Sequence, residues 1–372
     1  MDDLGPNGPG QERYLHFDSS GNTYFDPCFL AGTKISVCGE FQDIDDLVVG
    51  GQIDVFVKGQ TSQQTISWIG KSVRKSSPHL PDDQAGYPVR VLKDAISDGV
   101  PFKDMLITAE HCLFFDGKFV PARMLVNGRS IFFDKTITSY DYYHIETENH
   151  SVIMADGMLT ESYLDTGNRH SFSQSGNVIS TGHSRNLTWD DAAAPLTVSR
   201  ETVEPLFRQI ATRAEKAGVA IHTPVRPLTN DSAIHLTTET GLVIRPTREH
   251  NGQVIFMIPG GIENVRLVSH ASRPCNVIGP FVDDRRQLGV LVGEIKLFEC
   301  DTTQTLTDHL YDPHLSGWNN VEEGTTRWTN GNARLSLGHR ASDSIALMAI
   351  EVRAAGPYIL DENFFEQHAL TA

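Results

Sequence analysis

A cysteine at the head of a predicted strand is the first residue of this sequence that could do chemistry. Cys28 follows Pro27 and begins the segment Cys-Phe-Leu-Ala-Gly-Thr-Lys-Ile, in which a turn of small residues leads into an apolar run. A thiolate is a strong nucleophile, but an ordinary cysteine has a pKa of about 8.5 and needs help from a neighbouring group to react at neutral pH. The alternative for an isolated cysteine is a small, buried and inert side chain.

Two later segments carry side chains that could assist such a nucleophile. The first is an apolar strand that ends in Thr108-x-x-His111, and the second is a strand-turn-strand pattern over residues 142–159 that contains His150. An imidazole can accept or donate a proton, and a threonine hydroxyl can orient a peptide bond or bind an oxyanion. We therefore take Cys28, Thr108, His111 and His150 as candidate catalytic residues. We assign His144, in the same pattern as His150, to a structural role.

In this order, the three segments resemble the processing blocks of the Hint (Hedgehog/intein) domain family, and in particular its bacterial branch. The resemblance runs from Cys28 to about His170 and includes Trp68-Ile69-Gly70. It implies an all-β domain of horseshoe type that cleaves its own backbone. The thiol of Cys28 would attack the Pro27 carbonyl to form a thioester. His111 would protonate the departing nitrogen, and Thr108 would orient the scissile peptide.

The sequence also departs from the inteins, which end in a His-Asn pair. The corresponding place here reads Thr160-Glu161-Ser162, so we do not expect splicing. The resemblance implies an N-to-S acyl shift at Pro27–Cys28 that gives N-terminal cleavage, in cis and without multiple turnover. The substrate would be the chain's own N-terminal segment, and no cofactor or metal is implied. One alternative is a catalytically inert Hint scaffold that presents a C-terminal carbohydrate- or protein-binding β domain. Another is a hydrolase that acts on an external substrate.

Composition excludes some partners and indicates a location. The 372 residues carry a net charge of −16, which argues against nucleic acid or an anionic membrane surface as a partner. The five cysteines have no metal-site spacing and suggest no disulfide framework, which suits a reducing compartment. We find no signal peptide or membrane span. We therefore expect a cytoplasmic protein by default, and export would require a non-classical route.

Apolar runs and turn signals predict a mainly β chain in four parts. We expect a leader over 1–27 and a Hint-type domain over 28–170, where short β runs alternate with turns such as Asp116-Gly117. We expect a linker plus helix over 171–220. Apolar spacing places the helix near 199–216, with Pro205 in its first turn. The strand pattern over 221–372 predicts a β-rich C-terminal domain of sandwich type.

Two tryptophans in the C-terminal part have neighbours that sugar-binding domains also use. Trp318 is followed by Asn319-Asn320, and Trp328 by Thr-Asn-Gly-Asn. An exposed indole can stack on a sugar ring while amides bind its hydroxyls. We favour the alternative, in which both tryptophans pack into the core of the sandwich.

Overall fold

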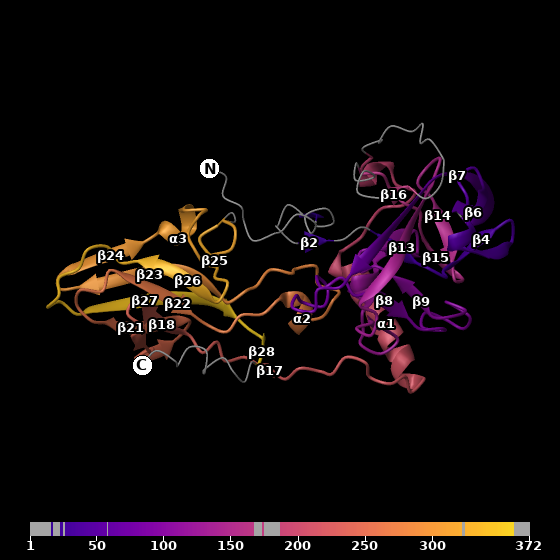
Figure 1. Cartoon of the computed structure of the whole chain (residues 1–372). Coiled ribbons are helices and arrows are strands. Elements are labelled where there is room, and N and C mark those ends of the chain that lie inside the picture. Colours follow the sequence, from indigo (N-terminus) through magenta and orange to yellow (C-terminus); the bar gives the residue numbers. More distant parts are fainter. Residues whose placement is uncertain are drawn as a thin grey trace. The chain divides into compact units, whose positions relative to one another are not determined.

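The computed structural model describes residues 27–57, 59–166, 187–321 and 324–360, together with the backbone of three short strands (Figure 1). Those strands are β1 (His16–Phe17), β2 (Thr23–Tyr24) and β16 (Ser173–Gln174). The rest of the expected leader and most of the expected linker region up to residue 186 lie outside the described residues. The chain is mainly β, as predicted, and divides into two compact units. Unit 1 comprises Met1–Pro224 with Pro280–Asp283, and unit 2 comprises Val225–Gly279 with Asp284–Ala372.

One large sheet organises unit 1, and all of its pairings are antiparallel. Its strands follow the order β11-β10-β15-β14-β6-β7-β13-β3-β9-β8-β12, with β4 joined to β14 and β5, and β16 joined to β7. Their bounds are β3 Phe29–Leu30, β4 Lys34–Val37, β5 Glu40–Asp43, β6 Gln52–Val57, β7 Gln60–Lys75, β8 Val89–Val91, β9 Met105–Ile107, β10 Cys112–Phe115, β11 Lys118–Pro121, β12 Ile131–Phe133, β13 Ser139–Thr147, β14 Val152–Ala155 and β15 Met158–Glu161.

Strand β13 is buried on both faces, and this divides the apolar interior of unit 1. Successive side chains of a strand point to opposite faces. Tyr143 and Ile145 belong to the main core, whereas Tyr140 and Tyr142 belong to a separate aromatic cluster that also contains Cys28. The candidate nucleophile therefore lies on the face of β13 that points away from the main core.

Helix α1 (Arg200–Lys216) follows the predicted bounds closely and ends just before Gly218. Its buried side chains are Val203, Ile210 and Ala214, which the apolar spacing predicted. The predicted place of Pro205 is wrong, because it is the sixth helical residue rather than part of the first turn. Pro205 is exposed, so water can bond to the carbonyl that the proline leaves without an N–H donor. The described residues of unit 1 also form the short 3₁₀ helices η1 (Ile44–Asp46), η2 (Ala122–Leu125) and η4 (Trp189–Asp191).

Unit 2 contains two antiparallel sheets that share one apolar core. The first has the order β19-β18-β22-β26, and the second β20-β21-β27-β23-β24 with β25 paired to β23. Residues of both sheets, such as Leu267 and Phe256, lie in the same buried cluster, so the expected sandwich arrangement is present. The bounds are β18 His235–Thr238, β19 Val243–Ile244, β20 Arg248–His250, β21 Gln253–Ile258, β22 Asn264–Val268, β23 Val290–Glu299, β24 Thr302–Leu306, β25 Arg327–Trp328, β26 Asn332–Ser336 and β27 Ala346–Ala355.

A short strand pair, β17 (Leu228–Thr229) with β28 (Tyr358–Ile359), and two short helices, α2 (Pro274–Val277) and α3 (Asp308–Tyr311), complete unit 2. Trp318 is buried in its core, and its indole N–H donates to the Arg334 carbonyl at 2.8 Å. This tryptophan is therefore a packing residue. Among the described residues, no helix has the length and apolar character needed to cross a membrane.

Candidate active site

Cys28 lies immediately before the short strand β3, which is flanked by β9 and β13. Phe29 pairs with Ile107 on one side and with Tyr143 on the other. Antiparallel registers run in opposite directions, so the residue before Phe29 lies between Thr108 and His144. The sheet thus brings together three residues from distant parts of the chain.

Two hydrogen bonds with Thr108 fix the backbone of Cys28. Its N–H donates to Oγ1 of Thr108 at 2.8 Å, and its carbonyl accepts from the N–H of Thr108 at 3.0 Å. The hydroxyl of Thr108 therefore contacts the nitrogen that would leave if the Pro27–Cys28 bond were broken. Thr108 is 4% exposed, so this bond is shielded from water.

The thiol of Cys28 faces an imidazole. Its Sγ lies 3.0 Å from Nε2 of His144, and the exposed fractions of both residues are 1%. A nitrogen at this distance can accept the thiol proton and leave a thiolate. Aromatic rings surround the pair: His144 lies 4.6 Å from Tyr163 and stacks with Trp68 at 6.2 Å between ring centroids.

The place of Trp68 depends on a glycine. Gly70 pairs with His144 across β7 and β13, and a Cβ built on Gly70 would lie 2.2 Å from the Trp68 ring. The indole therefore folds over a backbone that has no side chain. This explains why the segment Trp68-Ile69-Gly70 combines the largest and the smallest residue types.

His111 is held in one tautomer by a chain of hydrogen bonds. Its Nε2 lies 2.6 Å from Oγ1 of Thr160, and that hydroxyl donates to the Cys112 carbonyl at 2.6 Å. Because a hydroxyl has one hydrogen, Thr160 must accept from Nε2–H. Nδ1 of His111 then carries the lone pair, and it is buried with no hydrogen-bond partner in the described part of the chain. Burial, and to a lesser degree the charge of His144, lowers the pKa of His111 to about 3.

Backbone bonds and a buried ion pair hold the turn that carries His111. The His111 N–H donates to the Thr108 carbonyl at 3.2 Å, and the His111 carbonyl accepts from Ala122 at 2.9 Å. Next to His111, Glu110 pairs with the buried Arg123 at 2.9 Å. Thr108 and His111 therefore lie on one rigid turn.

His150 lies in a different set of contacts. Its Nε2 donates to the Ser162 carbonyl at 2.9 Å, and its Nδ1 accepts from the N–H of Ala193 at 3.1 Å. Burial lowers its pKa to about 4, so the imidazole is neutral. None of the contacts of His150 with the described residues involves Cys28 or His111.

A buried carboxyl lies between these two histidines in the fold. Glu161 accepts from the N–H of Cys112 at 2.7 Å, and its other oxygen is 4.0 Å from Nε2 of His150. Burial raises the pKa of Glu161 to about 8, so the carboxyl is mostly protonated at neutral pH. Burial also raises the pKa of the Cys112 thiol, which therefore stays protonated and passive. No group of three or more metal-ligating side chains occurs among the described residues.

One family model matches the part of the chain that contains these residues. The family model described as Hint domain matches residues 27–167. Residues 27–167 are a Hint domain. Its match begins one residue before Cys28 and includes Thr108, His111 and His144. The predicted resemblance to the Hint family is thus confirmed for this part of the chain.

The comparison with solved structures gives distant matches. A solution structure of a bacterial intein-like domain from Clostridium thermocellum is similar over 37% of this chain and 98% of that chain, with 13% identity and a TM-score of 0.27. No curated protein matches the chain.

Of the predicted site residues, the Hint domain brings Cys28 and Thr108 into direct contact and places His111 on the same turn as Thr108. It places His150 elsewhere. The sequence analysis assigned His144 to a structural role and did not foresee that its imidazole contacts the thiol. The available signal was the alternation of β13, which puts Tyr142 and His144 on the same face as Cys28.

Proposed function

We propose that the Hint domain performs an N-to-S acyl shift at the Pro27–Cys28 bond and so releases the chain that precedes Cys28. The observation that carries the proposal is the position of Cys28 between Thr108 and His144. The nucleophilic sulfur has a base at 3.0 Å, and the leaving nitrogen has a hydroxyl at 2.8 Å. Because attacking and leaving atoms belong to one residue, the reaction is intramolecular and gains from proximity.

The shift begins at the thiol. Nε2 of His144 takes the proton of Sγ, and the sulfur attacks the carbonyl carbon of Pro27. The C–N bond then breaks, and its electron pair goes to the nitrogen of Cys28, which takes up one proton. The products are a thioester on Cys28 and a free amine. One proton leaves the sulfur and one reaches the nitrogen, so the step needs no external acid, base or oxidant.

His111 is the proposed acid at the nitrogen. With a pKa lowered to about 3, its imidazole is neutral at rest, and a proton that it receives is strongly acidic. Such a proton transfers readily to a departing amide nitrogen, which is otherwise a poor leaving group. Nδ1 is the ring nitrogen that carries the lone pair, because Thr160 holds Nε2. Both histidines therefore have a role: His144 accepts the thiol proton, and this same proton passes to Nδ1 of His111 and from there to the amine.

A second nucleophile completes the cleavage. Water or a thiol adds to the thioester carbonyl, the C–S bond breaks, and the thiol of Cys28 is regenerated. Splicing is not part of the proposal. The place of the intein His-Asn pair is taken by residues committed to other contacts, since Thr160 bonds to His111 and Glu161 bonds to the backbone of Cys112.

Intact mass spectrometry of the purified full chain, with and without dithiothreitol, tests the proposal. A thiol nucleophile should increase a product that begins at Cys28, and Cys28→Ala should abolish it. Cys38→Ala is the matched control, because Cys38 is an exposed cysteine of the same unit. The product must begin at Cys28 rather than at Pro27, because the Asp26–Pro27 bond is itself labile in acid.

Two further variants separate the proposed roles. His144→Gln removes the base and should slow thioester formation by about 10²–10⁴-fold, the usual contribution of a general base. Thr108→Val should slow the reaction, while Thr108→Ser, which keeps the hydroxyl, should retain most of the rate. An unchanged full-length mass under every condition would contradict the proposal. It would favour an inert scaffold that presents the C-terminal β domain.

A further inference from the structure

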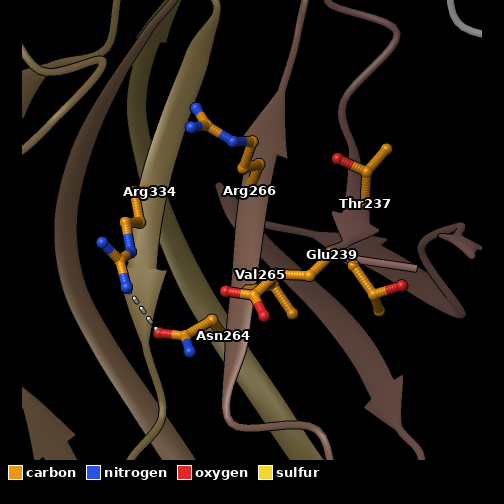
Figure 2. A pocket seen from close by; sticks show the side chains of 7 residues that line it. Thr237, Glu239, Asn264, Val265, Arg266 and Arg334 are labelled. Carbon is orange, nitrogen blue, oxygen red and sulfur yellow. Dashed lines mark hydrogen bonds between the residues drawn. The ribbon is translucent and has the colours of Figure 1, made fainter. Parts of the chain in front are cut away.

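The outer face of the four-stranded sheet in unit 2 carries two arginines that lie directly opposite each other. Arg266 on β22 pairs directly with Arg334 on β26, and Thr237 on β18 pairs with Arg266 from the other side. Figure 2 shows the two arginine side chains projecting from neighbouring strands. Like charges directly opposite each other in a sheet are destabilising. The arrangement therefore carries an energetic cost that a bound anion would offset.

The two guanidinium groups have weak partners in the protein. Arg334 donates to Oδ1 of Asn264 at 3.3 Å (Figure 2). Arg266 donates to Oδ1 and the carbonyl of Asn332 at 3.3 and 3.4 Å. Both arginines are exposed, and neither forms an ion pair with any residue that the structure describes. Since a guanidinium has five N–H donors, most of the donors of both side chains remain available.

These arginines line a pocket of ≈ 200 Å³. Six of the seven residues that line it have polar side chains, and the full set is Thr237, Thr238, Glu239, Asn264, Val265, Arg266 and Arg334. The volume is below the roughly 300–1,000 Å³ of pockets that hold drug-sized ligands. A pocket of this volume can hold a single small polar group of a ligand.

The carboxylate of Glu239 decides which kind of anion fits. A bare inorganic anion would be repelled by Glu239, whereas a ligand with hydroxyl groups would donate hydrogen bonds to it. Thr237, Thr238 and Asn264 add further partners for hydroxyl groups. An acidic peptide without serine, threonine or tyrosine would bring carboxylates but no hydroxyl donors. The chemistry of the pocket is thus that of a polyhydroxylated carboxylate.

We propose that this pocket binds a uronic acid residue of an acidic saccharide. Its carboxylate lies between Arg266 and Arg334, and its hydroxyls face Glu239 and the threonines. This inference does not depend on the proposed cleavage, because the pocket lies in unit 2 and Cys28 lies in unit 1. It assigns the carbohydrate site to charged residues on the sheet rather than to Trp318, which is buried.

Isothermal titration calorimetry of the full chain with an oligogalacturonate at low salt tests this proposal. A neutral galactose oligomer of the same length, a polyglutamate and inorganic sulfate are the comparison ligands. We expect the oligogalacturonate to bind most tightly and its affinity to fall with added salt. Equal affinity for the neutral oligomer, the polyglutamate or sulfate would overturn the assignment of a saccharide acid.

Variants then locate the site. Arg266→Gln and Arg334→Gln should each weaken binding by at least about tenfold, the loss of one charge-assisted hydrogen bond. Arg248→Gln is the matched control, since Arg248 is an exposed arginine on the other sheet. Glu239→Gln should weaken oligogalacturonate binding and strengthen sulfate binding. Loss of affinity in the Arg248 variant, or none in the Arg266 and Arg334 variants, would refute the site.

Discussion

Replacing His111 by glutamine should change how the stability of unit 1 depends on pH. Glutamine keeps an N–H donor for Thr160 but has no group that titrates. In the folded chain the pKa of His111 is lowered from 6.5 to about 3, because the buried imidazolium would be poorly solvated. Below pH 6.5 the unfolded chain therefore binds a proton at His111. The folded chain does not bind this proton until the pH approaches 3.

The sign and size of the effect follow from this difference. The contribution of neutral His111 to stability is fully present above pH 6.5 and is lost as the pH falls toward 3. At pH 4.5 the solution is two pH units below the unfolded pKa of 6.5. Each pH unit removes about 1.36 kcal/mol of unfolding free energy. Between pH 7.5 and 4.5, the chain with His111 should thus lose about 2.7 kcal/mol more unfolding free energy than the His111→Gln variant.

Both chains should carry Cys28→Ala, so that cleavage does not change the molecule during the measurement. Hydrogen exchange followed by mass spectrometry in urea, read from peptides of β13, gives the unfolding free energy of unit 1 specifically. His150 and Glu161 titrate in both chains, so their contributions cancel in the comparison. Parallel pH dependences in the two chains would show that His111 is not held neutral by burial. The proposed role as a strong transient acid would then fail.

Three other substitutions should change stability by amounts that follow from contacts in the structure. Glu161→Gln removes a carboxyl group, and burial raises the pKa of that group to about 8. The contribution of the protonated Glu161 carboxyl to stability is present below pH 4.5 and is lost as the pH rises through 8. The parent should therefore lose up to about 5 kcal/mol relative to the variant between pH 4.5 and 9 in the same exchange assay. Gly70→Ala places a Cβ 2.2 Å from the Trp68 ring, so unit 1 should lose about 1–3 kcal/mol in urea unfolding and cleavage should slow. An unchanged urea midpoint would contradict the tight fit. Arg327→Met removes a 2% exposed guanidinium that donates to the carbonyls of Asn319, His309 and Asp312; it should cost unit 2 about 3 kcal/mol or more, measured by exchange in β23.

Local patterns in the sequence were enough to predict most elements. The helix near 199–216 followed from apolar spacing, and strands such as β21 and β22 followed from short β-branched runs between turns. These features depend on neighbours within a few residues. The placement of Pro205 failed because its exposed position tolerates a missing hydrogen bond deeper in the helix than expected.

The site was only partly predictable because its contacts join distant segments. Cys28 and His144 are separated by 116 positions, and Cys28 and Thr108 by 80. Their meeting depends on the registers of β3 with β13 and β9, which no local pattern encodes. A single histidine on a tyrosine-rich strand resembles a packing residue, so His144 was assigned to structure. Thr108 and His111 were found because the family motif joins them to Cys28.

The burial of Cys28 determines which cysteines are vulnerable to oxidation. Sulfenic acid formation and alkylation require access from solvent as well as thiolate character. Cys28 is 1% exposed behind Trp68 and the tyrosines of its cluster, whereas Cys38 and Cys300 are exposed. Peroxide would therefore modify those two residues first and leave the nucleophile intact. Burial thus keeps the thiol of Cys28 reduced where exposed thiols are oxidised, which the proposed acyl shift requires.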